Sequence, residues 1–349
     1  MNIGIDLGGT KTEIICLDNE RRERYRQRVT SPQNNYHSTV DTIRSLVEQT
    51  ERTLNITATV GIGIPGSINR SVGNRNSSNR SSETVKNSNS TWINGQPFKK
   101  DLQEALGREI KIENDANCFA LSESIDGAAT TYSTVFGVII GTGCGGGLVV
   151  DGSLVSGPNG IAGEWGHNPL PFPRILNNKQ SLNNEFFDRY GKAEVSSIYQ
   201  KKQSVNYSAE TMDENEYPGP LCYCGKRGCL ETWISGSGFA LDFQRLSGEL
   251  ISSEEIIQLV EMGDVLAGKC LGRYCERLAK SLSQVINIID PDVIVLGGGM
   301  SNINALYDEV ISRWDKYIFS DTDLMTPLVK AHHGDSSGVR GAALLWPQK

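Results

Sequence analysis

The sequence predicts an α/β fold built from two related domains with a cleft between them. Apolar strand-type runs alternate along the chain with longer segments that carry apolar residues at helical spacing, an order typical of α/β proteins. Each half also begins with a pair of strand-type runs joined by a glycine- and threonine-rich turn, "IDLGGTKT" in the first half and "IIGTGCGG" in the second. Because internal similarity indicates a repeated structural unit, we expect the two halves to form similar domains.

The first half contains the elements of one such domain. "NIGIDLGG" and "TEIICLD" are apolar runs around a Gly-Gly turn, which predicts a hairpin. Val40, Ile43 and Leu46 lie at helical spacing and predict a helix over Thr39 to Leu54. The buried strand "TVGIGIPG", a helix over Phe98 to Leu106 and the strand "IKIEND" follow.

The second half repeats this alternation. "ANCFALSESIDGAA" predicts a helix, and "TVFGVIIGTGCGGGLVV" predicts two strands around a glycine-rich turn. Gly268 to Ile289 has the apolar periodicity of a long amphipathic helix. "DPDVIVLGGGMS" is a buried strand that runs into three glycines.

Two stretches depart from the pattern. Arg70 to Thr84 is rich in Asn, Ser and Arg and has almost nothing apolar to bury, so we expect a mobile surface loop. Pro173 to Tyr217 is long and polar, with a short helix expected around Asn184 to Tyr190.

The composition is that of an ordinary folded protein, and its charge balance excludes some classes of partner. The chain has 349 residues, 38% of them hydrophobic and 21% charged, and a net charge of −7. The acidic balance argues against nucleic acid and against an anionic membrane surface as partners. No apolar run has the length needed to cross a bilayer, and the N-terminus does not read as a signal peptide. We therefore expect a cytoplasmic protein with reduced thiols.

Three of the eight cysteines lie close together in "LCYCGKRGCLET". A reducing compartment argues against a disulfide knot, and Gly225 and Gly228 let the turn fold tightly enough for several sulfurs to face one point. Three thiolates leave one position open in a tetrahedral zinc site, and imidazole commonly fills it. The spacing alone does not choose among the four histidines, which are His37, His167, His332 and His333.

Three glycine-rich turns follow strand-type runs. "DLGGTKT" and "GTGCGGG" place backbone amides and hydroxyls where they can contact phosphate oxygens, and Asp6 could reach a magnesium ion. The first turn fits neither the P-loop nor the dinucleotide-binding fingerprint. The third cluster, Gly297 to Gly299, would let the backbone approach a flat adenine. Taken together, the three turns indicate a nucleotide site.

Four polar residues are candidates for the chemistry, and each has a plain structural alternative. Asp115 lies where a strand passes into a helix and suits a general base, but a residue at this point more often caps the helix. Glu164 and His167 in "EWGH" could bind a ligand or only hydrogen-bond within a loop. Glu231 follows the cysteine turn and could equally be a solvated carboxylate at a helix start.

The motifs "DLGGTKT", "GIPG", "ENDAN", "GTGCGGG", "EWGH" and "CYCGKRGCLE", in this order, resemble those of the ROK family of sugar kinases and repressors. The similarity covers nearly the whole chain apart from the two stretches above. It implies an actin-like, Hsp70-like ATPase fold of two α/β domains around a central cleft. We expect domains over 1–116 and 117–333, the latter with the zinc site, and a C-terminal helix within 334–349 that packs back on the first domain.

The resemblance also implies roles for the candidate residues. Zinc would be structural and held by His167 with Cys222, Cys224 and Cys229. Asp115 would be the catalytic base. The sugar would be bound by Gly66, Asn89, Asn114, Asp115, Glu164, His167 and Glu231. ATP, with Mg²⁺ as the catalytic metal, would be bound by Asp6, Gly8, Gly9, Thr10, Lys11, Thr12, Gly141, Thr142, Gly143, Gly145, Gly297, Gly298 and Gly299.

The phrases that flank these motifs favour one substrate. "VKNSNSTWINGQPF", "AGEWGHNPLP" and "GDSSGVRGAA" resemble bacterial fructokinases of the mannofructokinase type within the family. We therefore expect a homodimeric kinase that phosphorylates the 6-hydroxyl of D-fructose and of D-mannose. Glucokinase and N-acetylglucosamine kinase are the alternatives. A sugar-responsive repressor is disfavoured, because it would carry a DNA-binding segment before the turn that here begins at Asp6.

Overall fold

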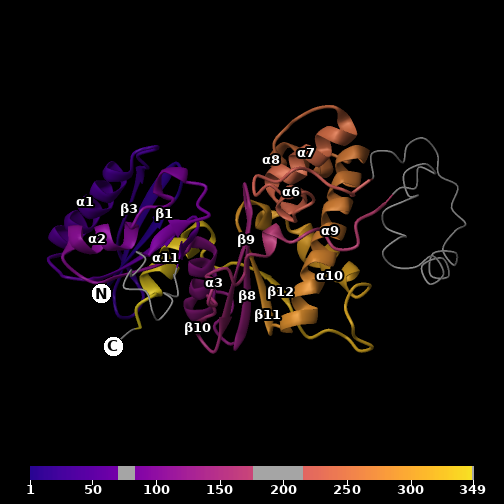
Figure 1. The fold of residues 1–349 in the computed structure, drawn as a ribbon. Coiled ribbons are helices and arrows are strands. Elements are labelled where there is room, and N and C mark those ends of the chain that lie inside the picture. Colours follow the sequence, from indigo (N-terminus) through magenta and orange to yellow (C-terminus); the bar gives the residue numbers. More distant parts are fainter. Residues whose placement is uncertain (70–82, 176–214, 348–349) are drawn as a thin grey trace, which may run out of the picture.

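The computed structural model describes residues 1–69, 83–175 and 215–347 and contains two five-stranded sheets with helices packed around them. The sheets lie on opposite sides of a pair of helices, α3 (Asp115–Asp126) and α11 (Ser337–Leu344) (Figure 1). The helix expected around Asn184 to Tyr190, and most of the Arg70 to Thr84 stretch, fall outside the described residues. No helix in the described ranges has the length and apolarity that a membrane span requires.

The first sheet has the strand order β3-β2-β1-β4-β7. Its strands are β1 (Asn2–Leu7), β2 (Lys11–Leu17), β3 (Glu23–Thr30), β4 (Thr59–Ile64) and β7 (Ile110–Asn114). β1 and β2 form the predicted hairpin, β3 extends it antiparallel, and β4 and β7 join in parallel. The ends of β4 and β7 therefore meet at one edge of the sheet, where ligands of α/β proteins commonly bind.

The second sheet repeats this plan with the order β10-β9-β8-β11-β12. It consists of β8 (Thr134–Ile140), β9 (Cys144–Val150), β10 (Ser153–Leu154), β11 (Val293–Gly297) and β12 (Leu328–Lys330). β8 pairs antiparallel with β9 and parallel with β11, as β1 does with β2 and β4. The predicted similarity of the two halves is thus confirmed by the topology.

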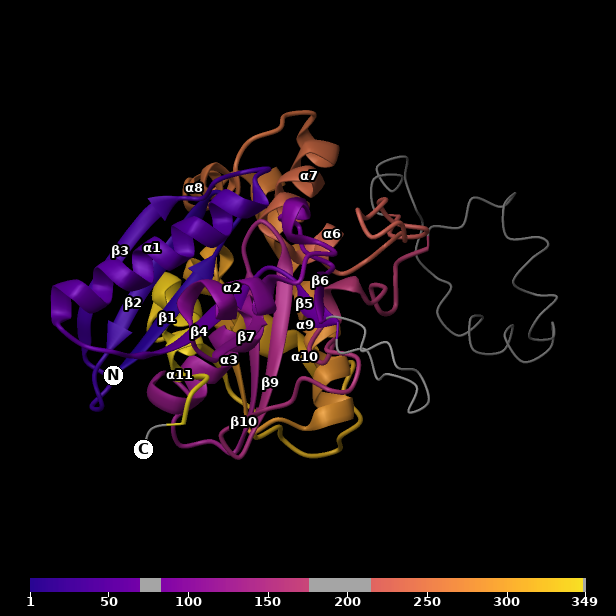
Figure 2. The same ribbon diagram turned by 60° about the vertical axis from the view of Figure 1, so that its left-hand side comes forward.

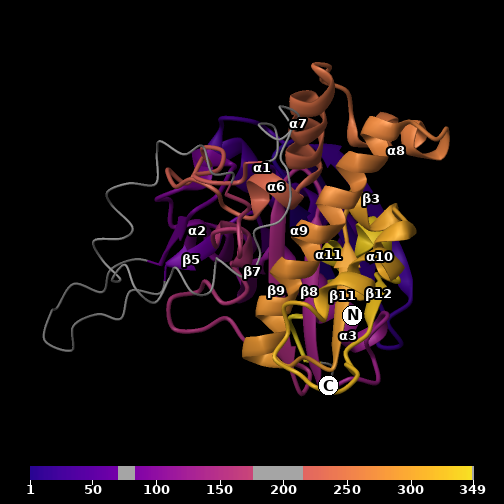
Figure 3. The same cartoon turned by 90° about the vertical axis from the view of Figure 1, so that its right-hand side faces the viewer.

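Helices cover both sheets. On the first sheet, α1 (Tyr36–Leu54) buries Ile43 and Val47 in a core shared with α2 (Phe98–Leu106). On the second, α9 (Val265–Ile289) runs along one face with α10 (Ala305–Trp314) beside it (Figure 3). The described residues of this half also include α6 (Glu231–Ile234), α7 (Gly236–Ser247) and α8 (Ser253–Glu261). A small hairpin, β5 (Ser67–Asn69) and β6 (Thr84–Lys86), follows the end of β4 (Figure 2).

The C-terminal helix α11 packs on α3 and on the first sheet through β1, β2 and β4. Glycine allows α11 to lie this close to α3. A Cβ on Gly341 would collide with the Cys118 carbonyl of α3. A Cβ on Gly61 of β4 would likewise collide with the Ala342 carbonyl. The two segments thus interlock between the sheets. We propose that the chain divides into two domains, 1–116 and 117–333, and a C-terminal segment, 334–349, that packs back on the first domain.

Candidate active site

A cavity of about 730 Å³ lies where strands of both sheets end. It is lined by residues that follow β4 and β7 of the first sheet and β8 of the second, together with the loop before Glu164 and the cysteine turn. The cavity brings together most of the predicted site: Gly66, Asn89, Asn114, Asp115, Gly141, Thr142, Gly143, Gly145, Glu164, His167, Cys224 and Glu231.

The helix α3 begins at Asp115, but its cap is Asn114. The Asn114 side-chain oxygen accepts hydrogen bonds from the amides of Ala116 at 2.9 Å and Asn117 at 3.3 Å. Its side-chain nitrogen donates to the Gly66 carbonyl at 3.1 Å. Because Asn114 satisfies the first helix amides, Asp115 is not needed as the cap. Its carboxylate accepts a hydrogen bond from the Ala116 amide at 2.8 Å and lines the cavity.

Electrostatics prepare Asp115 to accept a proton near neutral pH. Burial raises the pKa of Asp115 to about 6, the Ala116 amide opposes this rise, and the negative charge of Glu164 adds to it. A carboxylate with a pKa close to the working pH is mostly ionised there and still holds a proton once it has taken one. This is the behaviour required of a general base.

Glu164 and His167 reach the cavity from a loop that packs tightly on β9. Trp165, between them, donates its indole N–H to the Gly145 carbonyl at 3.0 Å. A Cβ on Gly166 would collide with the Cys144 carbonyl, so this loop tolerates no bulkier residue there. The pKa of Glu164 is raised by burial and by the charge of Glu231, while His167 opposes the shift.

Glu231 is the first residue of α6 and faces the second glycine turn. Its carboxylate accepts a hydrogen bond from the Cys144 amide at 3.0 Å. A Cβ on Gly143 would lie 2.7 Å from a Glu231 carboxylate oxygen, so glycine is what allows this approach. The carboxylate is therefore held by the protein at the wall of the cavity and is not a free solvated group.

His167 and the three clustered cysteines come together as a candidate metal centre. The ligand atoms of His167, Cys222, Cys224 and Cys229 all lie within 4.8 Å of one another. The His167 Nδ1 is 3.6 Å from the Cys222 sulfur, and the Cys224 and Cys229 sulfurs are 3.6 Å apart. Tetrahedral zinc with bonds of about 2.3 Å to sulfur places neighbouring ligands roughly 3.8 Å apart. The residues therefore fit a structural zinc ion.

The long excursion between His167 and Cys222, 55 positions apart, is closed by backbone pairing. Leu170 donates its amide to the Gly228 carbonyl at 2.8 Å, and Leu230 donates to the Asn168 carbonyl at 2.8 Å. These bonds place the cysteine turn alongside the histidine loop. A long intervening segment adds little to the cost of closing the loop.

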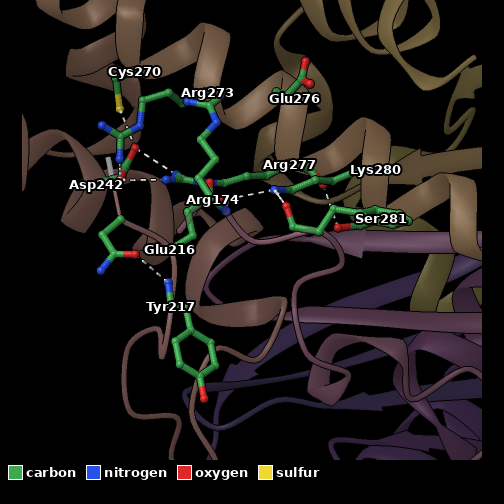
Figure 4. Close-up of polar contacts among 12 residues, drawn as sticks. Arg174, Glu216, Tyr217, Asp242, Cys270, Arg273, Glu276, Arg277, Lys280 and Ser281 are labelled. Atoms are coloured by element: carbon green, nitrogen blue, oxygen red, sulfur yellow. Dashed lines mark hydrogen bonds and ion pairs between the residues drawn. The ribbon is translucent and has the colours of Figure 1, made fainter. Parts of the chain in front are cut away.

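A buried group of charged residues anchors the chain just before the turn (Figure 4). Glu216 lies 2.7 Å from Arg277 and 2.8 Å from Lys280 of α9, and Arg277 lies 2.8 Å from Asp242 of α7. All four side chains are at most 2% exposed. Although Glu216 is buried, the charges of Arg277 and Lys280 lower its pKa to about 2. Removing one member of such a group lowers the free energy of unfolding by about 3–5 kcal/mol, so the group holds this segment of the chain in place.

The first glycine turn lies outside the cavity lining. Burial and the charges of Asp115 and Glu13 raise the pKa of Asp6 to about 7, which indicates that Asp6 and Asp115 belong to one region of negative charge. Within the turn, the Gly8 amide donates to the Lys11 carbonyl at 2.9 Å. The Thr12 side chain is buried and its hydroxyl is 2.8 Å from that of Ser31, so it supports the turn from inside the protein.

The third glycine cluster is packed partly inside the protein. A Cβ on Gly297 would collide with the ring of Phe119, and one on Gly298 would collide with the Ile140 carbonyl. Gly298 also has a φ of 80°, which favours glycine. Packing inside the protein thus explains these two glycines without a nucleotide. Only Gly299, where a Cβ would meet nothing within 4 Å, borders open space.

Sequence reasoning missed Tyr223, which lies between two of the cysteines and lines the cavity. Its hydroxyl is 3.0 Å from the His167 Nε2, whereas the other ring nitrogen, Nδ1, faces the Cys222 sulfur. Lys226 of the same turn and Asn168 also line the cavity. The only feature of the sequence that could have indicated these three residues is their position inside or beside the motifs.

We predict that purified protein contains about one zinc ion per chain by elemental analysis, because one His/Cys₃ set makes one tetrahedral site. Cys224→Ser should lower both the zinc content and the melting temperature. Cys118→Ser is the matched control, since Cys118 is buried away from the cluster. Full zinc occupancy in His167→Ala would show that another residue is the fourth ligand.

The comparisons with known proteins agree with this geometry. The ROK family profile matches residues 2–349. N-acetyl-D-glucosamine kinase of Mannheimia succiniciproducens is 36% identical over 351 residues and 100% of both chains, and that of Citrobacter koseri is 34% identical over 345 residues and 99% of both chains. Among solved structures, a ROK hexokinase from Thermus thermophilus has a TM-score of 0.73 at 25% identity, covering 98% of this chain and 96% of its own.

A ROK glucokinase from Streptomyces griseus, solved with glucose and AMPPNP, has a TM-score of 0.68 at 22% identity and covers 100% of this chain and 99% of its own. These likenesses confirm the predicted actin-like ATPase fold. The match over nearly every residue leads to one conclusion: this chain belongs to the ROK family.

Proposed function

We propose that this chain is an ATP-dependent sugar kinase that transfers the γ-phosphoryl group to the 6-hydroxyl of a hexose. The observation that carries the proposal is the place of Asp115. The half-buried carboxylate, with a pKa of about 6, shares one cavity with the Gly141–Gly145 turn and with Glu164, His167 and Glu231. A base, hydroxyl-binding groups and a phosphate-binding turn around one cavity are the parts that phosphoryl transfer requires.

In the proposed reaction, Asp115 takes the proton of the sugar hydroxyl while the hydroxyl oxygen attacks the γ-phosphorus. The bond between the γ-phosphorus and the bridging oxygen breaks, and ADP leaves with its electrons. Glu164, Glu231 and His167 hold other sugar hydroxyls, because carboxylates and imidazole pair well with them. Asn114 orients the base through the helix cap, and its side chain is already bonded to Gly66 and the helix amides.

The nucleotide would occupy the side of the cavity formed by Gly141, Thr142 and Gly143, with the first glycine turn facing the phosphates. Asp6 is the residue that would hold the Mg²⁺ that accompanies ATP. Burial, and then the charges of Asp115 and Glu13, raise its pKa, and a bound cation would offset that negative charge. When bound, the metal neutralises phosphate charge. Zinc, in contrast, would be structural and would fix the turn that presents His167 and Glu231.

Two substrates are supported by different observations. The relatives named above are N-acetyl-D-glucosamine kinases, so the comparisons favour the alternative left open by the sequence over the expected fructose. Fructose, with mannose, is favoured by the phrases that flank the motifs. Both sugars carry a 6-hydroxyl and would use the same base, so the kinase proposal does not depend on this choice.

We predict that Asp115→Asn lowers kcat by roughly 10²–10⁴-fold, the usual worth of general-base catalysis, because the amide cannot accept the proton. Sugar and ATP affinities, measured by calorimetry, should change little. In the unaltered enzyme, kcat/KM should fall as the pH drops below about 6, since protonation of Asp115 removes the base. The matched control is Asp151→Asn, at an exposed turn position that suits asparagine. Near-normal turnover in Asp115→Asn would refute the assigned base.

We predict that the product is a sugar 6-phosphate, to be read by phosphorus NMR after a coupled ADP assay identifies the hexoses that are consumed. The panel should contain fructose, mannose, glucose and N-acetylglucosamine at matched concentrations. A 1-phosphate would contradict the proposed sugar orientation. Failure to release ADP with any hexose would contradict the kinase proposal itself.

A further inference from the structure

The most informative feature of the cavity outside the predicted set is Tyr223. It lies on the cysteine turn between Cys222 and Cys224, and it lines the cavity although it is 72% exposed. Its hydroxyl is 3.0 Å from the His167 Nε2, and its ring meets the imidazole edge-on with centroids 5.2 Å apart. Tyr223 is therefore a large side chain in direct contact with His167, one of the residues proposed to bind the sugar.

The orientation of His167 makes this position important. Its Nδ1 faces the Cys222 sulfur at 3.6 Å and belongs to the candidate metal centre. Nε2 is then the nitrogen left for a ligand in the cavity, and Tyr223 already contacts it. Any sugar substituent that reaches Nε2 must fit beside the tyrosine ring.

The groups around the His167 Nε2 favour a small sugar substituent that can donate a hydrogen bond. Glu164 and Glu231 line the same wall, and an ionised carboxylate only accepts hydrogen bonds. A sugar hydroxyl can donate to them and still accept a bond from the imidazole. An acetamido group can donate through its N–H, but it also brings a carbonyl, which only accepts, and three more heavy atoms than a hydroxyl where the ring already lies. A buried acceptor left facing carboxylates is unfavourable.

Tyr223 also lacks the features of a structural residue. Its ring is largely exposed and is not part of the hydrophobic cores of the described residues, whereas the flanking Cys222 is buried. The bonds that hold the turn are made by backbone groups of Gly228 and Leu230. Replacing the side chain should therefore leave the turn and its metal ligands in place.

We propose that Tyr223 is a specificity-determining residue that admits a hydroxyl beside His167 and excludes an acetamido group. The proposal rests on the proposed hexose kinase function and selects its substrate class. The chain then prefers hexoses without an N-acetyl substituent, such as fructose and mannose, over N-acetylglucosamine, although relatives that are about a third identical carry the latter name.

The test compares kcat/KM for N-acetylglucosamine and for fructose in three variants. Tyr223→Ala removes the ring, and the ratio of N-acetylglucosamine to fructose should rise at least about tenfold, the usual scale for a change of a few atoms in a pocket. Tyr223→Phe keeps the ring, and the ratio should stay within about threefold. Leu221→Ala is the matched control, because Leu221 is 66% exposed on the same turn and does not line the cavity.

Zinc content and calorimetric binding of N-acetylglucosamine give readouts that do not depend on turnover. Zinc should stay at one per chain in all variants, and only Tyr223→Ala should bind the N-acetyl sugar more tightly. If that variant loses zinc, Tyr223→Ser repeats the test with a small polar residue. An unchanged or lower ratio in the ring-deleted variants would overturn the proposal, as would an equal rise in Tyr223→Phe. Absence of any hexose kinase activity would instead overturn the proposed function.

Discussion

The site depends on the junction at which strand β7 passes without a loop into helix α3. A strand can end and a helix begin within one residue only if the first helix amides find partners at once. Asn114 supplies them, and it also binds the Gly66 carbonyl at the end of the neighbouring strand. Asp115 is consequently held at the wall of the cavity by two elements that belong to different layers of the fold.

The rest of the cavity is assembled around that fixed point by two further constraints. Close packing of glycines lets α11 and α3 interlock between the sheets, so the residues at the strand ends of both domains face one space. Backbone pairing and the buried ion group at Glu216 hold the cysteine turn next to the histidine loop. Burial is the main reason why the pKa values of Asp6, Asp115 and Glu164 are all raised, and the negative charge of neighbouring carboxylates adds to each rise.

Local patterns were sufficient for the elements with strong periodicity. The first hairpin and α2 lie where the sequence predicts them, and the long helix α9 only starts three residues earlier, because Asp264 caps it. β3 was missed because its exposed Arg side chains, such as Arg26 and Arg28, hide the strand alternation. The helices α7, α8 and α10 were missed although they carry apolar residues, because at 12, 9 and 10 residues they are too short for a clear helical period.

For the site, sequence motifs predicted residue types better than they predicted contacts. The pair Asn114 and Asp115 offers two possible caps, and only the hydrogen bonds show which one is used. Thr12 and Gly298 fit a nucleotide motif, yet their partners are inside the protein. Tyr223 could not be foreseen, because its contact with His167 joins segments far apart in the sequence.

The central claim is that burial at the β7–α3 junction gives Asp115 the properties of a general base. The most direct test is the pKa of its carboxyl group, followed by carbon NMR of protein labelled at aspartate and assigned by comparison with Asp115→Asn. The account predicts a midpoint near pH 6. A carboxyl group that titrates near the ordinary aspartate value of about 3.9 would contradict it, because Asp115 would then be a solvated carboxylate like any other.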